Sequence, residues 1–204
     1  MSASGKQPVV LVAGTFCYPE AWDAMKAELE QRGFDVYAPP LRYHDLPILE
    51  GSRKMAEVSL TDYADDFVEL IETLEKPPII IGWSMGGAQR VEHAGLVLLS
   101  PAPAAGMFAM YPSMLRIFQH HFARWAFWRK PLIPEWETFI WGTGHLTPKP
   151  LMAEIFDQLK AESGRAYFEM SMWFLDKTKA SKVYPERIKG PVLVIAGESD
   201  RIVR

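Results

Sequence analysis

A buried strand that runs directly into a Gly-x-Ser-x-Gly turn is the feature that most constrains how this chain can fold. Residues 79–87 read IIIGWSMGG, with Ser84 at the centre of the turn. The flanking positions must be glycine because a Cβ at Gly82 or Gly86 would clash across the tight bend. We therefore expect a strained backbone at Ser84 and an exposed hydroxyl, followed by a short helix that starts near Gly86.

Short aliphatic runs elsewhere in the chain predict the other strands of one sheet. They span residues 9–13, 34–38, 96–99 and 192–196. Apolar residues at helical spacing predict helices over residues 20–32 and 61–74, with Ser59 or Thr61 as the N-cap of the second. Helical crossovers between parallel strands cover both faces of a sheet. The sequence therefore predicts an α/β fold: a mostly parallel sheet of about five buried strands with helices on both faces.

The long segment between the fourth and fifth strands has a different character. It is rich in aromatic residues and methionine, contains no clear strand pattern, and is divided into short helices by prolines. Those prolines are Pro131, Pro134, Pro148 and Pro150. We expect a helical cap over residues 103–184, inserted into a core domain made of residues 1–102 and 185–204.

Composition excludes several classes of protein. The chain has 204 residues, of which 49% are hydrophobic, and its 22 basic and 25 acidic residues give a net charge of −3. This charge, with no run of five like charges, argues against nucleic-acid partners, and no apolar run is long enough for a membrane span. Cys17 is the single cysteine, so neither an internal disulfide nor a cysteine-rich zinc site can form. The N-terminus lacks the apolar core of a signal peptide, and we expect a cytoplasmic protein.

The order of the strands places two loops together. If the five strands are arranged 2-1-3-4-5, the topological switch lies between the first and third, and ligands bind there outside the carboxyl ends of the strands. Thr15 and Ser84 follow those two strands. The N-terminus of a helix after Ser84 would offer unpaired amides, so the Met85 amide is placed to receive a developing negative charge.

Four segments in this order resemble the α/β-hydrolase superfamily, in particular its serine esterases with a helical cap. They read VVLVAGTF, GWSMGG, LVLLSPAP and PVLVIAGESDRIV. By this resemblance Ser84 is the nucleophile, the Thr15 amide joins that of Met85 in an oxyanion hole, and Asp200 is the acid of the triad. Glu198 is the less favoured acid. Relatives usually have histidine at the position of Ala13, which leaves open how the oxyanion loop is ordered here.

The resemblance also implies a histidine base after the acid, and no histidine follows Asp200 in this sequence. Two explanations remain open. We favour the first, in which the sequence lacks a final strand and histidine loop of a longer chain; in the second, the protein has lost its base. His44 follows the second strand and is more typical of a surface turn than of a substitute base. His145 is more typical of a solvated loop.

A serine nucleophile in this superfamily points to acyl transfer. We expect hydrolysis of an ester, or a thioester, of an apolar acyl or alkyl substrate, because the aromatic residues of segment 103–184 favour an apolar pocket. The alternative is a non-catalytic protein that binds a ligand or a partner. No metal and no organic cofactor are implied, and Cys17 is expected to be a buried, inert side chain. The physiological substrate, its acyl length and the oligomeric state are not indicated.

Overall fold

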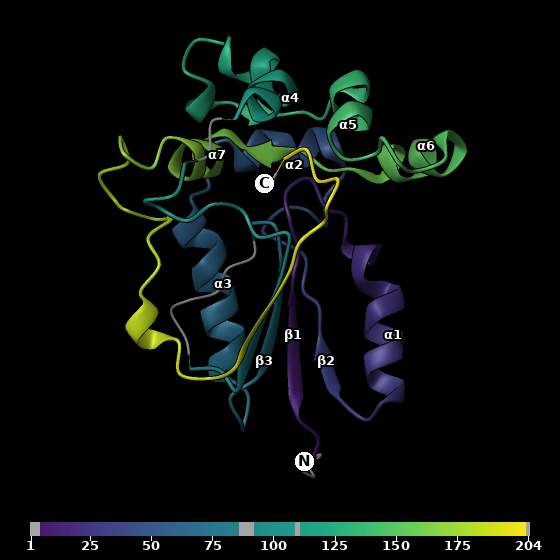
Figure 1. The fold of residues 1–204 in the computed structure, drawn as a ribbon, viewed down its shortest axis with the longest axis vertical. Coiled ribbons are helices and arrows are strands. Elements are labelled where there is room, and N and C mark those ends of the chain that lie inside the picture. Colours follow the sequence, from purple (N-terminus) through teal and green to yellow (C-terminus); the bar gives the residue numbers. More distant parts are fainter. Residues whose placement is uncertain (1–4, 86–91, 109–110, 203–204) are drawn as a thin grey trace.

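The computed structural model describes residues 5–85, 92–108 and 111–202 (Figure 1). Its main sheet is parallel, in the order β2-β1-β3-β4-β7, which confirms the predicted order of the five strands. The strands are β1 (Pro8–Val12), β2 (Asp35–Tyr37), β3 (Ile79–Trp83), β4 (Gly95–Leu99) and β7 (Val192–Ile195). The helix predicted to start near Gly86 lies outside the described residues.

Helices cover both faces of the sheet, as predicted. A short 3-10 helix, η1 (Pro19–Trp22), leads into α1 (Asp23–Gln31), which lies on one face, and α3 (Leu60–Glu72) lies on the other (Figure 1). The Ser59 hydroxyl accepts a hydrogen bond from the Asp62 amide at 3.0 Å, and the Asp62 carboxylate accepts one from the Ser59 amide at 2.7 Å. This capping box fixes the start of α3 at the first of the two predicted caps. A further helix, α2 (Ile48–Met55), was not predicted.

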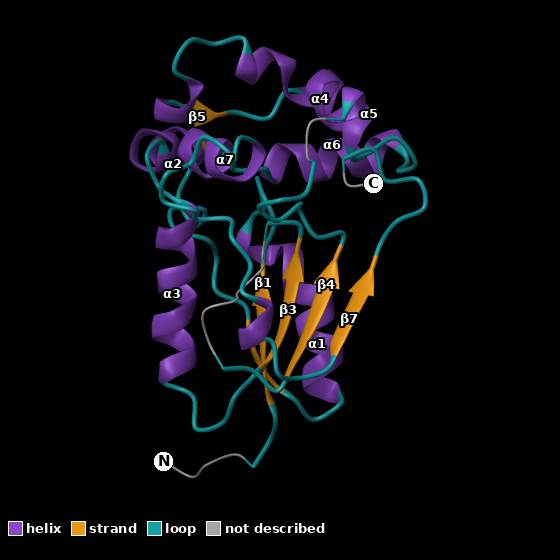
Figure 2. Ribbon diagram, turned by 60° about the vertical axis from the view of Figure 1, so that its left-hand side comes forward, coloured by secondary structure: helices purple, strands orange, loops and turns teal. Residues whose placement is uncertain are grey.

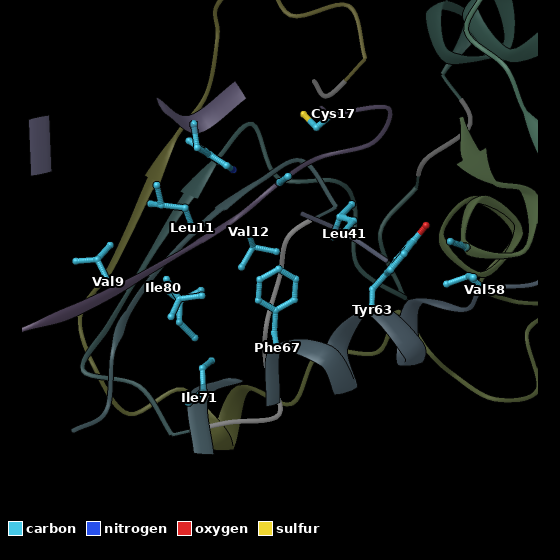
Figure 3. Close-up of a cluster of buried hydrophobic side chains, with 14 of the residues drawn as sticks. Val9, Leu11, Val12, Cys17, Leu41, Val58, Tyr63, Phe67, Ile71 and Ile80 are labelled. Atoms are coloured by element: carbon cyan, nitrogen blue, oxygen red, sulfur yellow. The ribbon is translucent and has the colours of Figure 1, made fainter. Parts of the chain in front are cut away.

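The core of the sheet lies between its central strands and α3. Val10 and Ile80 are fully buried on neighbouring strands. Tyr63, Phe67 and Ile71 are one helical turn apart and form the buried face of α3. Figure 3 shows this face directed toward the strands, with the Phe67 ring beside Val12. The periodic pattern read from the sequence therefore marks the side of α3 that contacts the sheet.

A second group of helices lies across the carboxyl ends of the strands (Figures 1 and 2). We call the segment from α4 to α7 the helical layer, and its own core includes Met114, Phe118, Leu132 and Tyr167. It contains two short strands that pair antiparallel, which were not predicted. The layer comprises α4 (Pro112–Phe122), η2 (Phe127–Arg129), β5 (Pro131–Leu132), α5 (Trp136–Gly142), α6 (Lys149–Gln158), β6 (Glu162–Ser163) and α7 (Gly164–Ser171). The 3-10 helix η3 (Pro185–Arg187) follows before β7. The domain boundaries at residues 103 and 184 stay a prediction.

Strand β7 differs from the prediction of buried strands. Its four side chains, Val192 to Ile195, are 48–56% exposed. Successive side chains of a strand point to opposite faces of the sheet, so β7 is open on both faces. The prediction of burial is wrong here: β7 lies at one of the two edges of the described sheet, and the described helices leave both of its faces partly open. No helix among the described residues is long and apolar enough to cross a membrane.

Candidate active site

Ser84 lies directly after β3 in a left-handed backbone conformation, with φ of 55°. This region is unfavourable for residues other than glycine, so the strained turn expected from the sequence is present. The end of β4 and the segment that follows it hold the turn: the Ser84 amide donates to the Leu99 carbonyl at 3.0 Å, and the Ala102 amide donates to the Ser84 carbonyl at 2.8 Å. The backbone of Ser84 is therefore fixed, while its side chain is half-buried.

The loop after β1 approaches Ser84 closely. A Cβ added at Gly14 would lie 3.1 Å from the Ser84 Cβ and 3.2 Å from the Trp83 carbonyl oxygen. Few real Cβ contacts are so short, which explains why glycine occupies this position. Strands β1 and β3 are neighbours in register, Val12 opposite Gly82, and this pairing brings the two loops together. The fold thus places the Thr15 loop beside Ser84, as the strand order predicts.

Hydrogen bonds from other elements hold the loop after β1, which we call the Gly14 loop (residues 14–17). The Lys160 amide donates to the Phe16 carbonyl at 3.0 Å, and the Tyr167 hydroxyl lies 3.3 Å from Thr15 Oγ1. The His44 Nδ1 lies 2.8 Å from the Cys17 carbonyl oxygen. A carbonyl oxygen only accepts hydrogen bonds, so Nδ1 carries the proton. His44 therefore orders this loop, although residue 13 is alanine.

His44 is buried, at 1% exposed, so the expectation of a surface turn is wrong. Its other nitrogen, Nε2, faces Glu162 Oε2 at 3.7 Å, and Glu162 is fully buried in β6 of the helical layer. The Tyr63 hydroxyl and the Ser163 amide both donate to Glu162 Oε1, at 2.7 and 2.6 Å. Burial and the nearby charge of Glu162 raise the pKa of Tyr63 well above its ordinary value, so Tyr63 remains a donor.

Nothing in the sequence marked Glu162 as a member of this network, because it lies in a segment predicted to be helical. The sequence predicted His44 as a loop residue after the second strand, but it did not predict that Glu162 lies opposite it. Cys17 is a buried free thiol, as expected, and burial raises its pKa to about 12. It remains protonated at neutral pH and is therefore a poor nucleophile.

A cavity of about 370 Å³ lies beside Ser84. Its lining is mostly apolar, and Met85 lies in it next to Ser84. It runs between β4, α3 and the segment that follows α7. The described lining residues are Val12, Ala13, Leu41, Leu60, Tyr63, Ala64, Phe67, Ser84, Met85, Leu96, Leu98, Pro101, Ala102, Pro103, Ala104, Met107, Met170, Thr178, Lys179, Ala180, Ser181, Lys182, Val183, Tyr184, Ile188 and Val192. A larger hollow of about 590 Å³, near Tyr18 and Phe156, contains none of the predicted site residues in its described lining.

Asp200 lies in the turn after β7, at the same edge of the sheet as Ser84 and separated from it by β4. Its Oδ1 accepts a hydrogen bond from the Ile202 amide at 2.8 Å, and its own amide donates to the Gly197 carbonyl at 3.1 Å. The next residue ties the turn to the helical layer, because Arg201 Nη1 donates to the Trp141 carbonyl at 2.9 Å. The fold therefore places the three predicted loops, which contain Thr15, Ser84 and Asp200, along one edge.

Comparisons with known proteins support the fold. A sequence profile of the alpha/beta hydrolase family matches residues 9–204. No curated protein matches the sequence. Among solved structures, an extracellular alpha/beta-hydrolase from a Paenibacillus species, described as sharing structural and functional homology with tobacco salicylic acid binding protein 2, has a TM-score of 0.66 at 18% identity, over 96% of this chain and 91% of that one. The monoacylglycerol lipase of Paleococcus ferrophilus has a TM-score of 0.64 at 22% identity, over 98% and 77%. An esterase from Exiguobacterium antarcticum has a TM-score of 0.63 at 17% identity, over 97% and 75%. At these identities the three structures show a shared fold.

Proposed function

The chain belongs to the alpha/beta hydrolase family, and from this premise we propose that it is a serine hydrolase that cleaves an ester, or a thioester, of an apolar acyl or alkyl substrate. One observation carries the proposal: Ser84 lies in a left-handed conformation after a central strand, beside a cavity and against the Gly14 loop. Backbone strain of this kind persists only where the surrounding structure enforces it, and it concentrates at functional sites.

In the proposed reaction, Ser84 Oγ attacks the carbonyl carbon of the substrate and loses its proton to a base. The carbonyl oxygen becomes an oxyanion, which the amides of Thr15 and Met85 stabilise by donating hydrogen bonds. The C–O or C–S bond then breaks, the leaving alcohol or thiol takes the proton, and an acyl-enzyme remains. Water hydrolyses this ester by the same steps and releases the acid.

Asp200 is proposed to orient the histidine that serves as the base. His44 does not fill this role, because its Nδ1 donates to the Cys17 carbonyl and its buried ring faces Glu162 and does not line the cavity. The described lining of the cavity contains no histidine.

The cavity supports an apolar substrate. A volume of about 370 Å³ lies within the usual range for small-molecule sites, and such sites are mostly apolar with a few polar groups. Met107, which precedes α4, and Met170, which lies on α7, both line the cavity. We propose that segment 103–184 acts as a cap, because it supplies much of the wall around Ser84.

A fluorophosphonate probe tests the nucleophile on the full-length gene product. We expect the probe to label Ser84 and the label to disappear in Ser84→Ala, together with a loss of at least about 10³-fold in p-nitrophenyl butyrate hydrolysis. Ser52→Ala is the matched control, because Ser52 is also a partly exposed serine but lies on α2 and bonds only to the Leu49 carbonyl. If the folded wild-type protein is not labelled, the proposal is wrong and a ligand-binding role is favoured.

A further inference from the structure

The segment between the helical layer and β7 is strongly basic. Residues 177–189 contain five basic residues and one acidic residue, Glu186, in a chain whose net charge is −3. The basic residues are Lys177, Lys179, Lys182, Arg187 and Lys189. Positive charge is therefore concentrated locally against the overall balance of the protein, and such a concentration attracts anions.

Two of these residues reach the cavity beside Ser84. Lys179 and Lys182 are the only charged residues in its described lining, which contains neither aspartate nor glutamate. Both lysines are exposed, and within the described part of the chain neither ammonium group forms an ion pair. The Lys182 ammonium lies 4.8 Å from the centre of the Tyr184 ring. The cavity thus combines an apolar interior with a positively charged rim.

The loop that bears the lysines is fixed by hydrogen bonds. The Asp176 carboxylate accepts from the amides of Thr178 and Ala180, at 2.8 and 2.7 Å. The Ser181 carbonyl accepts from the Ala105 amide at 3.0 Å, and the Ser181 hydroxyl donates to the Glu169 carbonyl at 2.9 Å. These bonds tie the loop to α7 and to the segment after β4, so the lysine backbones are held at the cavity.

We infer that the cavity selects amphiphilic substrates, in which an apolar chain occupies the lining and an anionic group, such as a carboxylate or phosphate, is held by Lys179 and Lys182. The inference deepens the proposed function, on which its substrate role rests, but binding of an anionic amphiphile does not require turnover. Exposed charge pairs contribute little individually, so we expect each lysine to favour the anion by about two- to fivefold.

Two fluorescent dyes that share a ring system test binding without catalysis. 1-Anilinonaphthalene-8-sulfonate is anionic, and N-phenyl-1-naphthylamine is its neutral counterpart. We expect the double variant Lys179→Glu/Lys182→Glu to bind the anionic dye about tenfold more weakly, with binding of the neutral dye unchanged within twofold. Added salt should weaken binding of the anionic dye to the wild-type protein and leave the neutral dye unaffected.

The matched control is Lys177→Glu/Lys189→Glu, which makes the same change of charge on the same segment at residues that do not line the cavity. If this control variant weakens binding of the anionic dye as much as the test variant does, the effect arises from the overall charge of the segment and the inference is wrong. The inference is also wrong if the test variant weakens the binding of both dyes equally, or changes the binding of neither.

Turnover separates this inference from the proposed function. p-Nitrophenyl octanoate and mono-p-nitrophenyl suberate have acyl chains of equal length, and only the second ends in a carboxylate. We expect the ratio of their kcat/KM values, suberate over octanoate, to fall about tenfold in Lys179→Glu/Lys182→Glu. An unchanged ratio with active enzyme overturns the inference alone. If the wild-type protein turns over neither ester but prefers the anionic dye, the proposed function fails and the anion site stands.

Discussion

At the scale of single residues, unfavourable backbone conformations cluster at the carboxyl ends of the central strands. Three residues other than glycine have positive φ values soon after neighbouring strands: Phe16 at 60°, Ser84 at 55° and Ser100 at 40°. Each lies in a loop at the carboxyl end of β1, β3 or β4. Unfavourable backbone conformations of this kind persist where surrounding contacts enforce them, and here those contacts include the hydrogen bonds at Ser84 and Phe16.

The close approach at Gly14 gives a prediction for a single methyl group. Gly14→Ala would push its Cβ against the Ser84 Cβ and the Trp83 carbonyl, so the Gly14 loop or Ser84 must shift by a few tenths of an ångström. We expect about tenfold slower fluorophosphonate labelling of a protein that remains folded, because reaction rates depend steeply on such displacements. Gly5→Ala is the control, since a Cβ there meets no atom within 4 Å. Equal labelling rates in the two variants would contradict this account.

At the scale of elements, β7 is the more exposed of the two outer strands of the described sheet. Strand β7 carries only aliphatic side chains, each about half exposed, and β4 is its partner on one side. Edge strands of this composition promote association with other chains through their free backbone groups.

A single charge on β7 should reduce this association. We expect Val194→Lys to lower light scattering at high protein concentration, while the free energy of unfolding changes by less than about 1 kcal/mol, because Val194 is 56% exposed. Leu146→Lys is the control: Leu146 is 75% exposed in a loop of the helical layer, and the change in net charge is the same. If both variants scatter equally less light, net charge rather than the edge strand is responsible.

The sequence predicts the elements whose patterns are local. The five strands, α1 and α3 follow from aliphatic runs, helical spacing and the Ser59 cap, whereas the order of the strands entered as an assumption that the structure matches. Helix α2 escaped prediction because Gly51 interrupts its pattern, and that glycine is needed where a Cβ would meet the Tyr43 carbonyl at 2.8 Å. The two-residue strands β5 and β6 are too short to show the alternation of apolar and polar residues that predicts a strand.

The candidate site divides in the same way. Ser84 and the Gly14 loop were predictable, because each follows a strand with a recognisable turn. The pairing of His44 with Glu162 was not, because it depends on how the helical layer docks on the sheet. The roles of Thr15, Met85 and Asp200 stay predictions, as does a cytoplasmic location.

At the scale of the whole molecule, buried polar contacts join the helical layer to the sheet. Glu162 in β6 faces His44 from the loop after β2 and accepts from Tyr63 on α3. Nearby, the Glu169 carboxylate of α7 accepts from the Leu60 amide at the start of α3, at 2.8 Å. These contacts join the two hydrophobic cores, so the stability of one depends on the other.

Removal of the central carboxylate should therefore destabilise the entire fold. We expect Glu162→Ala to lower the free energy of unfolding by about 3–5 kcal/mol in urea, because the Tyr63 hydroxyl and Ser163 amide would lose their acceptor in a buried site. Glu162→Gln retains an acceptor and should cost less, which keeps the test informative if the alanine variant does not fold. Glu154→Ala, an exposed glutamate on α6, should change stability by less than about 0.5 kcal/mol. Similar losses at positions 154 and 162 would refute the coupling.

The Gly14 loop is attached to the helical layer, and this attachment bears on any movement of the layer. The Lys160 amide donates to the Phe16 carbonyl, and the Tyr167 hydroxyl donates to Thr15 Oγ1. The layer therefore cannot move away as a rigid body without displacing the same loop. Entry of a ligand by movement of the layer would thus be coupled to the position of the loop beside Ser84. A form with the layer lifted would therefore lose the close approach of this loop to Ser84, and the approach would re-form only when the layer returned.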